Sequence, residues 1–574
     1  CPTPPQVMSN AKVMLAQLEE EEDVNWGNDP DWIRFQLVCR ECEDDAIYLQ
    51  MAKKGILCHS AALKGDVRRY TERLLRKGKA QYVYATNTLA QGVNLGVSTV
   101  IVVGTFISPG IYLTIRDFWN MAGRAGRSFV DTEGKILIVC DSKDQKTAGK
   151  SNWIADKFLD SDSVDRVESG IYHWLHRLKE IQERIGIDFD EFLQLIAEND
   201  LSQLEDAEDF FELVDDSLLA LDLAYRENED DEVSWVEEHF RQSLAVIQEA
   251  AENERQKNID ILKSRVRAVR KMTHSSPVPQ AFASSGIPLG VALFFEEQTE
   301  RMNAMVEEYL QSNRSLDEKL YFFYQFDQFV SEIPSSRIIR YELDELDQIR
   351  EAWIKGEPLN NKQMSVAEKY YGYTITWFMN ALAARHAIME EEEYKEFYEE
   401  MSLVAQYGLP TRWAVQIYLS GISSRKVSAE LAAKLDEPDD VSRLSYVARY
   451  IEQNADVISK SKDFSRLAKE WVAALKVRPA VNSATIPSIP KFRINGTDKD
   501  MEYERLLCKR YGDSTYLCSV DMKYHFPVKE KENMPFSKVA DIPGVFFRRE
   551  GSSWIMDCHN PYVEVNLDNI YEGK

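Results

Sequence analysis

The sequence predicts three parts in order: an α/β lobe, a large mostly α-helical region and a small β-rich C-terminal domain. Short apolar, β-branched runs alternate with polar turns in the first quarter of the chain, which is typical of a parallel sheet. Apolar residues then recur at helical spacing, and aromatic and β-branched residues alternate near the end. The expected boundaries are 1–150 for the lobe, 151–400 for a helical domain, 401–476 for a helix-turn-helix-like module, 477–490 for a linker and 491–574 for the β-rich domain.

The first motif is a strand, loop, strand unit in the lobe. Residues 83–84 end a short apolar strand, residues 85–95 form a small polar turn, and residues 98–104 form a second strand that we expect to be buried. Folds with α/β architecture bind ligands in the loops at this edge of the sheet. The sequence therefore predicts a ligand-binding loop at residues 85–95.

The second motif is Met-Ala-Gly-Arg-Ala-Gly-Arg at residues 121–127, which follows a helix-like stretch at 115–121 and precedes an apolar strand at 135–140. A spacing of three places Arg124 and Arg127 on one side of a helix or turn. Permanently charged, forked donors beside glycines suit a phosphate group that is approached closely. An arginine finger of this kind stabilises the charge that develops during phosphoryl transfer. The flanking loop and strand favour this interpretation over a surface turn with two solvated arginines.

Together these motifs resemble a known family. The order His-Ser-Ala-Ala-Leu at 59–63, Arg68-Arg69 with Glu72, Thr-Leu-Ala-Gln-Gly-Val-Asn-Leu at 88–95, and then the glycine-arginine run resembles the second RecA-like lobe of superkiller-like superfamily-two helicases, a DEAD/DEAH-box group. The resemblance implies an ATP-hydrolysing motor that moves 3′ to 5′. It also implies that a winged-helix and ratchet-like helical bundle contacts the translocating strand. Two departures are Asn120, where the family usually has Gln, and Gly96, where it usually has Pro.

The resemblance also implies site residues. In the family the threonine-rich loop couples the nucleic-acid backbone to the nucleotide, and the last arginine of the glycine-arginine run reaches the γ-phosphate. Arg127 and Arg124 are therefore the expected catalytic residues, with Arg127 as the finger. The residues expected to contact ATP are Gly92, Asn94, Gly123, Arg124 and Arg127. Those expected to contact nucleic acid in the lobe are His59, Arg68, Arg69, Thr86, Asn87 and Thr88.

A complete motor also needs a first lobe with a phosphate-binding glycine loop and an acidic pair for Mg²⁺. Neither is present before Gln81. Gly149-Lys150-Ser151 lacks the glycine that begins such a loop, because Asp144 stands there, and the acidic run at 344–347 follows no apolar strand. The chain begins with Cys1. We expect the C-terminal part of a longer helicase, with ATP and Mg²⁺ bound mainly by a first lobe in the same or another chain, and no metal site in this part.

Charge and cysteine usage agree with this interpretation. The net charge is −26, so a strand can bind only where basic residues cluster, as they do at 64–79 and 255–271. The eight scattered cysteines indicate reduced thiols in a cytoplasmic protein, and Cys39 and Cys42 lack the second pair that a zinc site needs. No apolar run reaches the roughly 18 to 20 residues of a membrane span.

The helical region offers two further candidates for strand contact. In residues 255–271, apolar residues can pack on one side while Arg265, Arg267 and Arg270 face a strand; a solvated helix face is equally favoured. Helices at 408–419 and 423–435 are expected to form a helix-turn-helix with basic residues near the turn, against which simple helix packing is at least as favoured. Residues 353–359 are expected to end a helix at a glycine. Other expected helices are 164–184, 190–198, 206–225, 233–272 and 289–312.

Three functions remain open. The first is an ATP-dependent helicase or translocase on single-stranded or forked DNA, or on RNA. The second is a non-catalytic nucleic-acid-binding or scaffold subunit. The third is a helicase that holds an effector protein, such as a nuclease in a bacterial antiphage defence complex, through residues 491–574.

Overall fold

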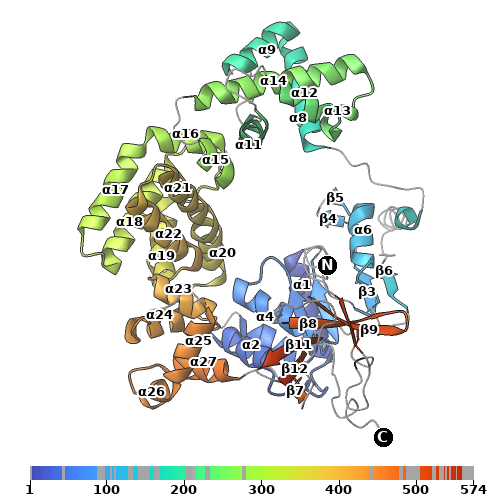
Figure 1. The fold of residues 1–574 in the computed structure, drawn as a ribbon, viewed down its shortest axis with the longest axis vertical. Helices are drawn as coiled ribbons and strands as arrows, with labels where there is room; N and C mark the ends of the chain where they lie inside the picture. Colours follow the sequence, from blue (N-terminus) through green and yellow to red (C-terminus); the bar gives the residue numbers. More distant parts are fainter. Residues whose placement is uncertain are drawn as a thin grey trace. The chain divides into compact units, whose positions relative to one another are not determined.

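The computed structural model describes residues 3–41, 45–86, 97–103, 106–108, 111–126, 133–139, 156–160, 169–200, 211–212, 214–226, 233–274, 279–335, 337–438, 444–477, 482–486, 505–519, 525–528, 536, 540–541, 545–550 and 553–558. The chain divides into two compact units (Figure 1). Unit 1 comprises Cys1–Leu113, Trp119–Trp153 and Ala473–Lys574, and unit 2 comprises Thr114–Phe118 and Ile154–Val472.

The N-terminal part of unit 1 contains two short parallel strands and the helices that pack on them. In chain order it consists of α1 (Pro4–Gln17), α2 (Pro30–Arg40), α3 (Ala46–Lys53), β1 (Ile56–His59), α4 (Gly65–Arg76) and β2 (Tyr82–Ala85). β1 and β2 pair from Ile56–Tyr82 to His59–Ala85, so both strands end at the same edge. Val7 of α1, Met51 of α3 and Ile56 of β1 share a buried apolar cluster that holds these elements together.

Two more strand pairs follow in unit 1. β3 (Thr99–Val102) pairs in parallel with β6 (Lys135–Ile138), and β4 (Phe106–Ser108) pairs with β5 (Ile111–Tyr112). The strands expected near residues 98–104 and 135–140 are thus confirmed. The expected burial of the first is wrong at Ile101, which is 55% exposed and is paired in register with Leu137, 53% exposed. Among the described residues β3 has a neighbouring strand on one side only, so less of its surface is covered than in a wide parallel sheet.

Unit 2 is built from helices, as the periodicity predicts. Its first group is α8 (Gly170–Ile185), α9 (Phe189–Glu198), α11 (Asp215–Tyr225), α12 (Ser234–Phe240), α13 (Leu244–Ile247) and α14 (Glu252–Thr273). The second group is α15 (Pro279–Ser285), α16 (Leu289–Glu297), α17 (Thr299–Gln311), α18 (Leu316–Ser331), α19 (Leu343–Ile354), α20 (Asn361–Lys369), η2 (Tyr370–Ile375), α21 (Thr376–Ile388) and α22 (Glu392–Tyr407). After these come α23 (Arg412–Leu419), α24 (Arg425–Lys434), α25 (Leu444–Gln453), α26 (Ala455–Lys460) and α27 (Arg466–Lys476), the last of which ends beyond the boundary of the unit.

Two helices expected to be continuous are interrupted. Residues 233–272 form α12, α13 and α14, because Ser243 and Ala251 both adopt extended backbone. Residues 289–312 form α16 and α17, which meet at Gln298. The pair α23 and α24 confirms the helices of the helix-turn-helix-like module, and the helix end expected near residue 356 is confirmed by Gly356 at φ +74° after α19.

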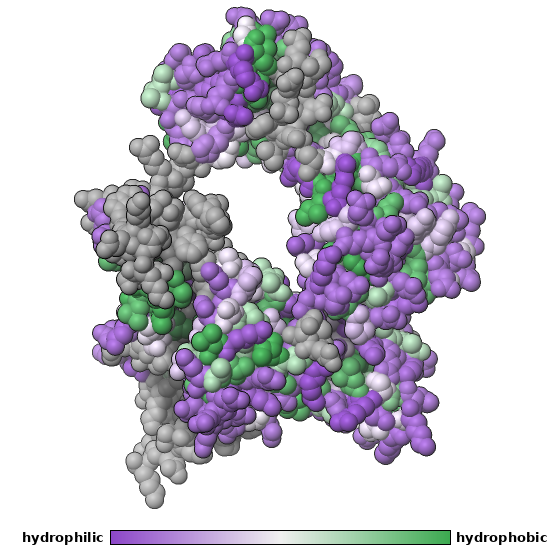
Figure 2. Space-filling view, turned by 180° about the vertical axis from the view of Figure 1, so that it is seen from behind, coloured by the Kyte–Doolittle hydropathy of each residue, from purple (hydrophilic) through white to green (hydrophobic). Residues whose placement is uncertain are grey.

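Each group of helices in unit 2 has its own apolar core. Trp174, Phe192 and Trp235 belong to the first, and Phe322, Phe326 and Phe378 belong to the second. Burying one such side chain stabilises a fold by about 1.5–3 kcal/mol, so these aromatic residues account for much of the stability of each core. On the face shown in Figure 2, the helices of unit 2 are mostly hydrophilic, with scattered apolar groups.

The segment η2 joins α20 to α21 as a π-helix. In this segment the backbone N–H of Thr376 donates to the carbonyl of Tyr371, five residues earlier. The hydroxyl of Thr376 donates to the same carbonyl at 2.8 Å, so Thr376 supports the wider turn. Tyr370, Tyr371 and Ile375 are buried, which places the π-helix within the second core.

The C-terminal part of unit 1 is an antiparallel sheet with the strand order β10-β9-β8-β11-β12-β7. The expected β-rich end of the chain is therefore confirmed, but its sheet begins earlier than expected, because a strand at Asn482–Ile486 lies within the predicted linker 477–490. The strands are β7 (Asn482–Ile486), β8 (Arg505–Tyr511), β9 (Ser514–Ser519), β10 (His525–Val528), β11 (Val545–Glu550) and β12 (Ser553–Cys558). Within the described ranges, no helix is both long and apolar enough to cross a membrane.

Candidate nucleotide and nucleic-acid site

The carboxyl ends of β1 and β2 form the start of the candidate site. Thr86 directly follows β2, and its backbone N–H donates to the carbonyl of His59, the last residue of β1, at 3.2 Å. Ligands of α/β folds bind at this edge, where the strand ends leave loops open to solvent. Thr86 is half-buried. Asn87, Thr88, Gly92 and Asn94 lie outside the described residues, so their expected roles stay predictions.

His59 has a different surrounding from the one expected for a strand contact. Its side chain is 6% exposed, and its Nε2 lies 2.9 Å from Oε1 of Glu72 on α4. Its Nδ1 is buried without a hydrogen-bond partner among the described residues. The ring therefore connects α4 to β1, and direct contact between this ring and a strand at the surface is a wrong expectation, because reaching a strand would break the contact with Glu72.

Four of the basic residues on α4 or directly beside it form ion pairs within the lobe. Arg69 lies 2.7 Å from Asp66, so its charge is partly neutralised, and it remains 38% exposed. Arg68 is half-buried and has no ion pair in the part of the chain that the structure describes. The other pairs are Lys64 with Asp45, Arg73 with Asp31, and Lys77 with Asp29 and Asp31. Arg68 thus stays the better candidate of the two for a phosphate contact.

The glycine-arginine run forms a turn that is tied to the start of β3. It follows α6 (Ile115–Ala122). Val97 donates its N–H to the carbonyl of Arg124 at 3.0 Å and accepts the N–H of Gly126 at 2.6 Å. Gly126 has φ +88°, a conformation that side chains rarely adopt. These bonds satisfy the backbone on both sides of Arg124, whose half-buried side chain is therefore held on a fixed turn.

Gly134 is a residue of this turn that sequence reasoning missed. A Cβ on Gly134 would lie 2.5 Å from the carbonyl oxygen of Ala125, and a Cβ on Gly126 would lie 3.2 Å from the Cα of Gly134. The two backbones touch because both residues lack side chains. The signal in the sequence is a glycine directly before the strand that begins at Lys135, and it becomes informative only once Ala125 is known to be its neighbour.

The position expected for the arginine finger, Arg127, lies outside the described residues. The structure describes Gly123 and Arg124, and the N–H of Gly123 continues the helical hydrogen bonding of α6 to the carbonyl of Trp119 at 2.8 Å. A guanidinium on a short turn of small residues has donors that suit the oxygens of a phosphate group.

Comparison with known proteins supplies the family of this lobe. Residues 27–129 match the helicase conserved C-terminal domain. Hachiman protein HamB of Bacillus cereus is 32% identical over 97% of this chain and 51% of its own length. ATP-dependent DNA helicase Hel308 of Caldivirga maquilingensis is 36% identical over 19% of the chain and 15% of its own length. Helicase POLQ-like of Drosophila melanogaster is 34% identical over 17% of the chain and 9% of its own length.

This chain contains the C-terminal part of a superfamily-two helicase. The matched residues 27–129 include β1, β2, β3, α6 and the glycine-arginine turn, so the family likeness covers the candidate site. The chain spans about half the length of HamB.

In the helical region of this helicase chain, Arg265 was expected to face a nucleic-acid strand, but it is buried. Arg265 is 3% exposed; its Nε and Nη2 donate to the two carboxylate oxygens of Asp215 at 2.7 and 2.5 Å, and its Nη1 donates to Asn199. Its guanidinium also lies 4.1 Å from the ring centroid of Phe211. Burial raises the pKa of Asp215, and the guanidinium opposes that rise. The expectation that Arg265 faces a strand is therefore wrong, because it is the buried partner of a carboxylate.

Arg270 is also paired inside the helicase chain. Its guanidinium donates to both oxygens of Asp222 at 2.8 and 2.6 Å, and Asp222 also accepts the indole N–H of Trp235. The proposed contact between Arg270 and a strand is therefore wrong as well. Arg267 is exposed and forms no ion pair among the described residues, so it stays a candidate.

The helix-turn-helix of the helicase chain uses its first arginine for packing. Arg425 lies 4.2 Å from the ring centroid of Trp353, and its guanidinium donates to the carbonyls of Trp353, Gly408 and Glu357. Gly408 has φ +60°, and a Cβ there would lie 2.5 Å from the indole of Trp353. Arg425 thus supports the alternative of simple helix packing.

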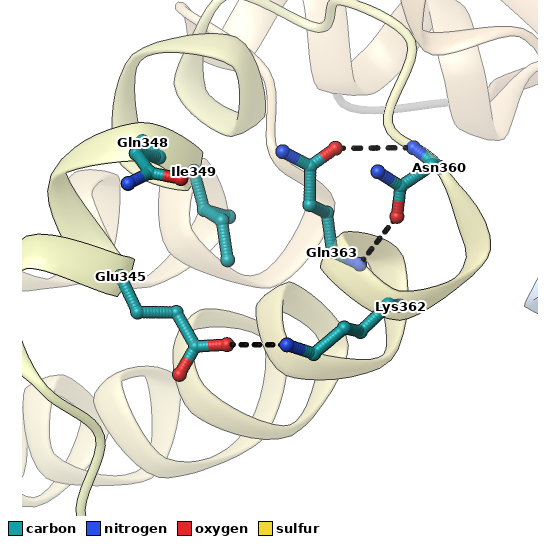
Figure 3. A pocket seen from close by; sticks show the side chains of 6 residues that line it. All are labelled: Glu345, Gln348, Ile349, Asn360, Lys362 and Gln363. Atoms are coloured by element: carbon teal, nitrogen blue, oxygen red, sulfur yellow. Dashed lines mark hydrogen bonds and ion pairs between the residues drawn. The ribbon is translucent and has the colours of Figure 1, made fainter.

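The acidic run at 344–347 begins α19. Glu345 faces Lys362 at 3.6 Å across a small hollow of about 200 Å³, and Asn360 and Gln363 form a capping box on its other side (Figure 3). Asp347 pairs with Arg350 at 2.7 Å. The polar groups here bind one another and mark a helix junction of the helicase chain.

Proposed function

We propose that this chain is the C-terminal part of an ATP-dependent helicase or translocase that moves 3′ to 5′ on single-stranded or forked DNA, with RNA as the alternative substrate. The glycine-arginine turn carries the proposal. Its backbone is fixed to the start of β3, and it lies in the segment that matches the helicase conserved C-terminal domain. In this proposal Arg127 is the arginine finger, Arg124 is the second nucleotide contact, and Thr86 begins the loop that couples the strand to the nucleotide.

The chemistry of the turn supports binding of a nucleotide phosphate. Gly126 and Gly134 let the backbone of the turn pack closely, since a Cβ on either residue would meet backbone atoms. ATP and Mg²⁺ would be held mainly by a first lobe, in the same chain or another. Arg124 and Arg127 would then supply positive charge opposite the transferred phosphoryl group, where it stabilises the transition state.

The test is Arg127→Ala in the complete protein, with Arg124→Ala beside it. We expect strand-stimulated ATP turnover to fall by about 10³- to 10⁵-fold for Arg127→Ala, the range for arginine fingers, while strand affinity changes little. Arg76→Ala is the matched control, because Arg76 is an exposed arginine on α4. Unchanged turnover in Arg127→Ala would contradict the finger assignment.

The intact mass of the purified protein decides how the motor is completed. A mass well above 66.2 kDa with strand-stimulated turnover supports a first lobe in the same chain. A mass near 66.2 kDa, with turnover only after a second protein is added, supports a first lobe in another chain. Absence of turnover under both conditions favours the second candidate function, a non-catalytic nucleic-acid-binding or scaffold subunit.

We further propose that the helicase acts in a bacterial antiphage defence complex and holds an effector protein through its C-terminal sheet. The similarity to HamB covers 97% of the chain, including the helical region and the sheet, whereas the similarity to Hel308 covers 19%. Shared architecture therefore extends well beyond the motor lobe. Recovery of the same partners from host cells after removal of residues 491–574 would contradict the role of this part.

A further inference from the structure

We infer that one face of the C-terminal sheet, the one that carries Tyr511, Tyr516 and His525, stacks the bases of a single-stranded nucleic acid. This surface, called the aromatic face below, lies on β8, β9 and β10. The inference does not depend on the motor, because no residue of the glycine-arginine turn takes part in it.

Strand register separates the two faces of the sheet. Side chains alternate along a strand, so Leu506 and Cys508 of β8 share a face with Leu517 of β9. These three side chains are buried, and Phe547 of β11, which pairs with Leu506, is also buried. Phe536 covers this side, with its ring 5.5 Å from that of Phe547. The first face is therefore an interior face, whereas the opposite face is exposed at the end that carries Tyr511 and buried at Cys518, which pairs with His525.

The aromatic face is the opposite side of the same strands. Tyr511 is 49% exposed, and its ring centroid lies 5.6 Å from that of Tyr516 and 5.7 Å from that of His525, both in edge-on geometry. His525 is exposed, and Tyr516 is half-buried. Three neighbouring rings of this kind on one sheet face resemble the surfaces on which proteins stack unpaired bases, because every base has a π-face that can cover a ring.

A basic side chain on this face can contact a phosphate. By register the aromatic face carries three basic positions, Arg505, Lys509 and Arg548, and two acidic positions, Glu550 and Asp557, in a chain whose net charge is −26. Lys509 lies beside Tyr516 in register on the aromatic face. Its Nζ is 3.8 Å from Asp541, a loose ion pair, and its side chain is 36% exposed. Lys509 can therefore reach a phosphate next to a stacked base.

The experiment measures binding of two fluorescent strands to the complete protein, one a thymidine 12-mer and the other an abasic 12-mer of the same charge. We expect Tyr511→Ala to weaken binding of the thymidine strand by about 5- to 100-fold, the range for loss of base stacking, and to leave binding of the abasic strand unchanged. Tyr511→Phe should bind both strands like the unaltered protein. Lys509→Ala should weaken both strands.

Tyr321→Ala is the matched control. Tyr321 is 46% exposed on α18 and lies near acidic residues, so its loss should change binding of neither strand. Equal weakening of both strands by Tyr511→Ala, or no weakening, would overturn the inference and leave the sheet as a protein-binding surface. Because Tyr511 ends its strand and is exposed, an unchanged melting temperature is expected for the variant.

Photocrosslinking separates this inference from the proposed motor. A strand with 4-thiothymidine should crosslink to peptides from residues 505–528, whether or not the protein hydrolyses ATP. Crosslinks confined to other peptides would overturn the inference without affecting the motor. Absence of ATP turnover together with crosslinks in 505–528 would contradict the motor and support the sheet.

Discussion

Helix α14 and the glycine-arginine turn are both rich in basic residues, but the structure uses their arginines in opposite ways. In α14, Arg265 and Arg270 form ion pairs with buried carboxylates, so their charges are neutralised inside unit 2. In the turn, the backbone N–H of Val97 donates to the carbonyl of Arg124, and Gly126 and Gly134 pack backbone against backbone. The difference teaches that the number of basic residues in a segment does not show whether their charges are available to a ligand.

Breaking the buried pair in α14 is the largest test of this comparison. Arg265→Ala leaves Asp215 buried and unpaired, so we expect it to lower the free energy of unfolding by about 3–5 kcal/mol. Denaturant titration of the complete protein measures the change. The double variant Arg265→Met with Asp215→Leu removes both charges, and should recover most of the stability. If Arg265→Ala changed strand affinity without changing stability, α14 would have to be regarded as a strand-binding helix.

A second buried pair, Asp327 with Arg350, adds a pH dependence. Asp327 is fully buried and receives hydrogen bonds from Arg350 and Tyr371 at 2.7 Å; burial raises its pKa to about 6 from 3.8. The folded protein then binds more protons than the unfolded chain between pH 4 and 6. The contribution of Asp327 to the free energy of unfolding therefore falls as the pH rises through this range, by about 3 kcal/mol at 1.36 kcal/mol per pKa unit.

The measurement for Asp327 is melting temperature from pH 4 to 7 for the unaltered protein and for Asp327→Asn. The variant should come nearest to the unaltered protein at pH 4, where Asp327 is itself largely protonated, and Arg350 keeps its ion pair with Asp347 in both proteins. Its melting temperature should also lack the decrease between pH 4 and 6 that comes from ionisation of Asp327. Parallel curves for the two proteins would mean that Asp327 does not titrate in this range.

The turn is tested by Gly134→Ala. The added Cβ meets the carbonyl of Ala125 at 2.5 Å, so the turn or β6 must move, and we expect a loss of about 1–3 kcal/mol of stability. Strand-stimulated ATP turnover should fall as well, because Arg124 is carried by the same turn. Gly170→Ala is the control, since no atom lies within 4 Å of a Cβ there. Equal behaviour of the two variants would show that the backbone contact is unimportant.

The smallest effect is expected at Arg267, the exposed arginine of α14. Arg267→Ala should change stability by less than about 0.5 kcal/mol, as is usual for surface substitutions. If Arg267 contacts a phosphate, the variant should bind all strand sequences more weakly, and the slope of affinity against salt should fall by about one. Unchanged affinity and salt slope would remove α14 from the strand-binding surface.

The sequence predicted the elements of the lobe well because its strands are short, apolar and separated by glycine-rich turns. It failed where the partner of a side chain lies far away in the chain. In α14, Arg265 lies 50 residues from Asp215 in the sequence, and Arg270 lies 48 residues from Asp222. Hydrophobic periodicity contains no information on such distant pairs. For the same reason Gly134 was missed and His59 was misplaced, because Ala125 and Glu72 become their neighbours only in the folded chain.

The π-helix at Tyr370–Ile375 has a consequence for how the second core tolerates insertions and deletions. A π-turn accommodates one residue more than an α-turn, and each residue of an α-helix turns the chain by about 100°. Removing one residue, for example Gly372, would let this segment wind as a regular α-helix, and α21 would keep its orientation relative to α20 because the π-turn is what absorbs the extra residue. Phe378 and Leu382, now buried, would then stay in the core. This segment should therefore tolerate the loss of one residue, whereas the same deletion within α21 would turn the residues beyond it by about 100° away from the core.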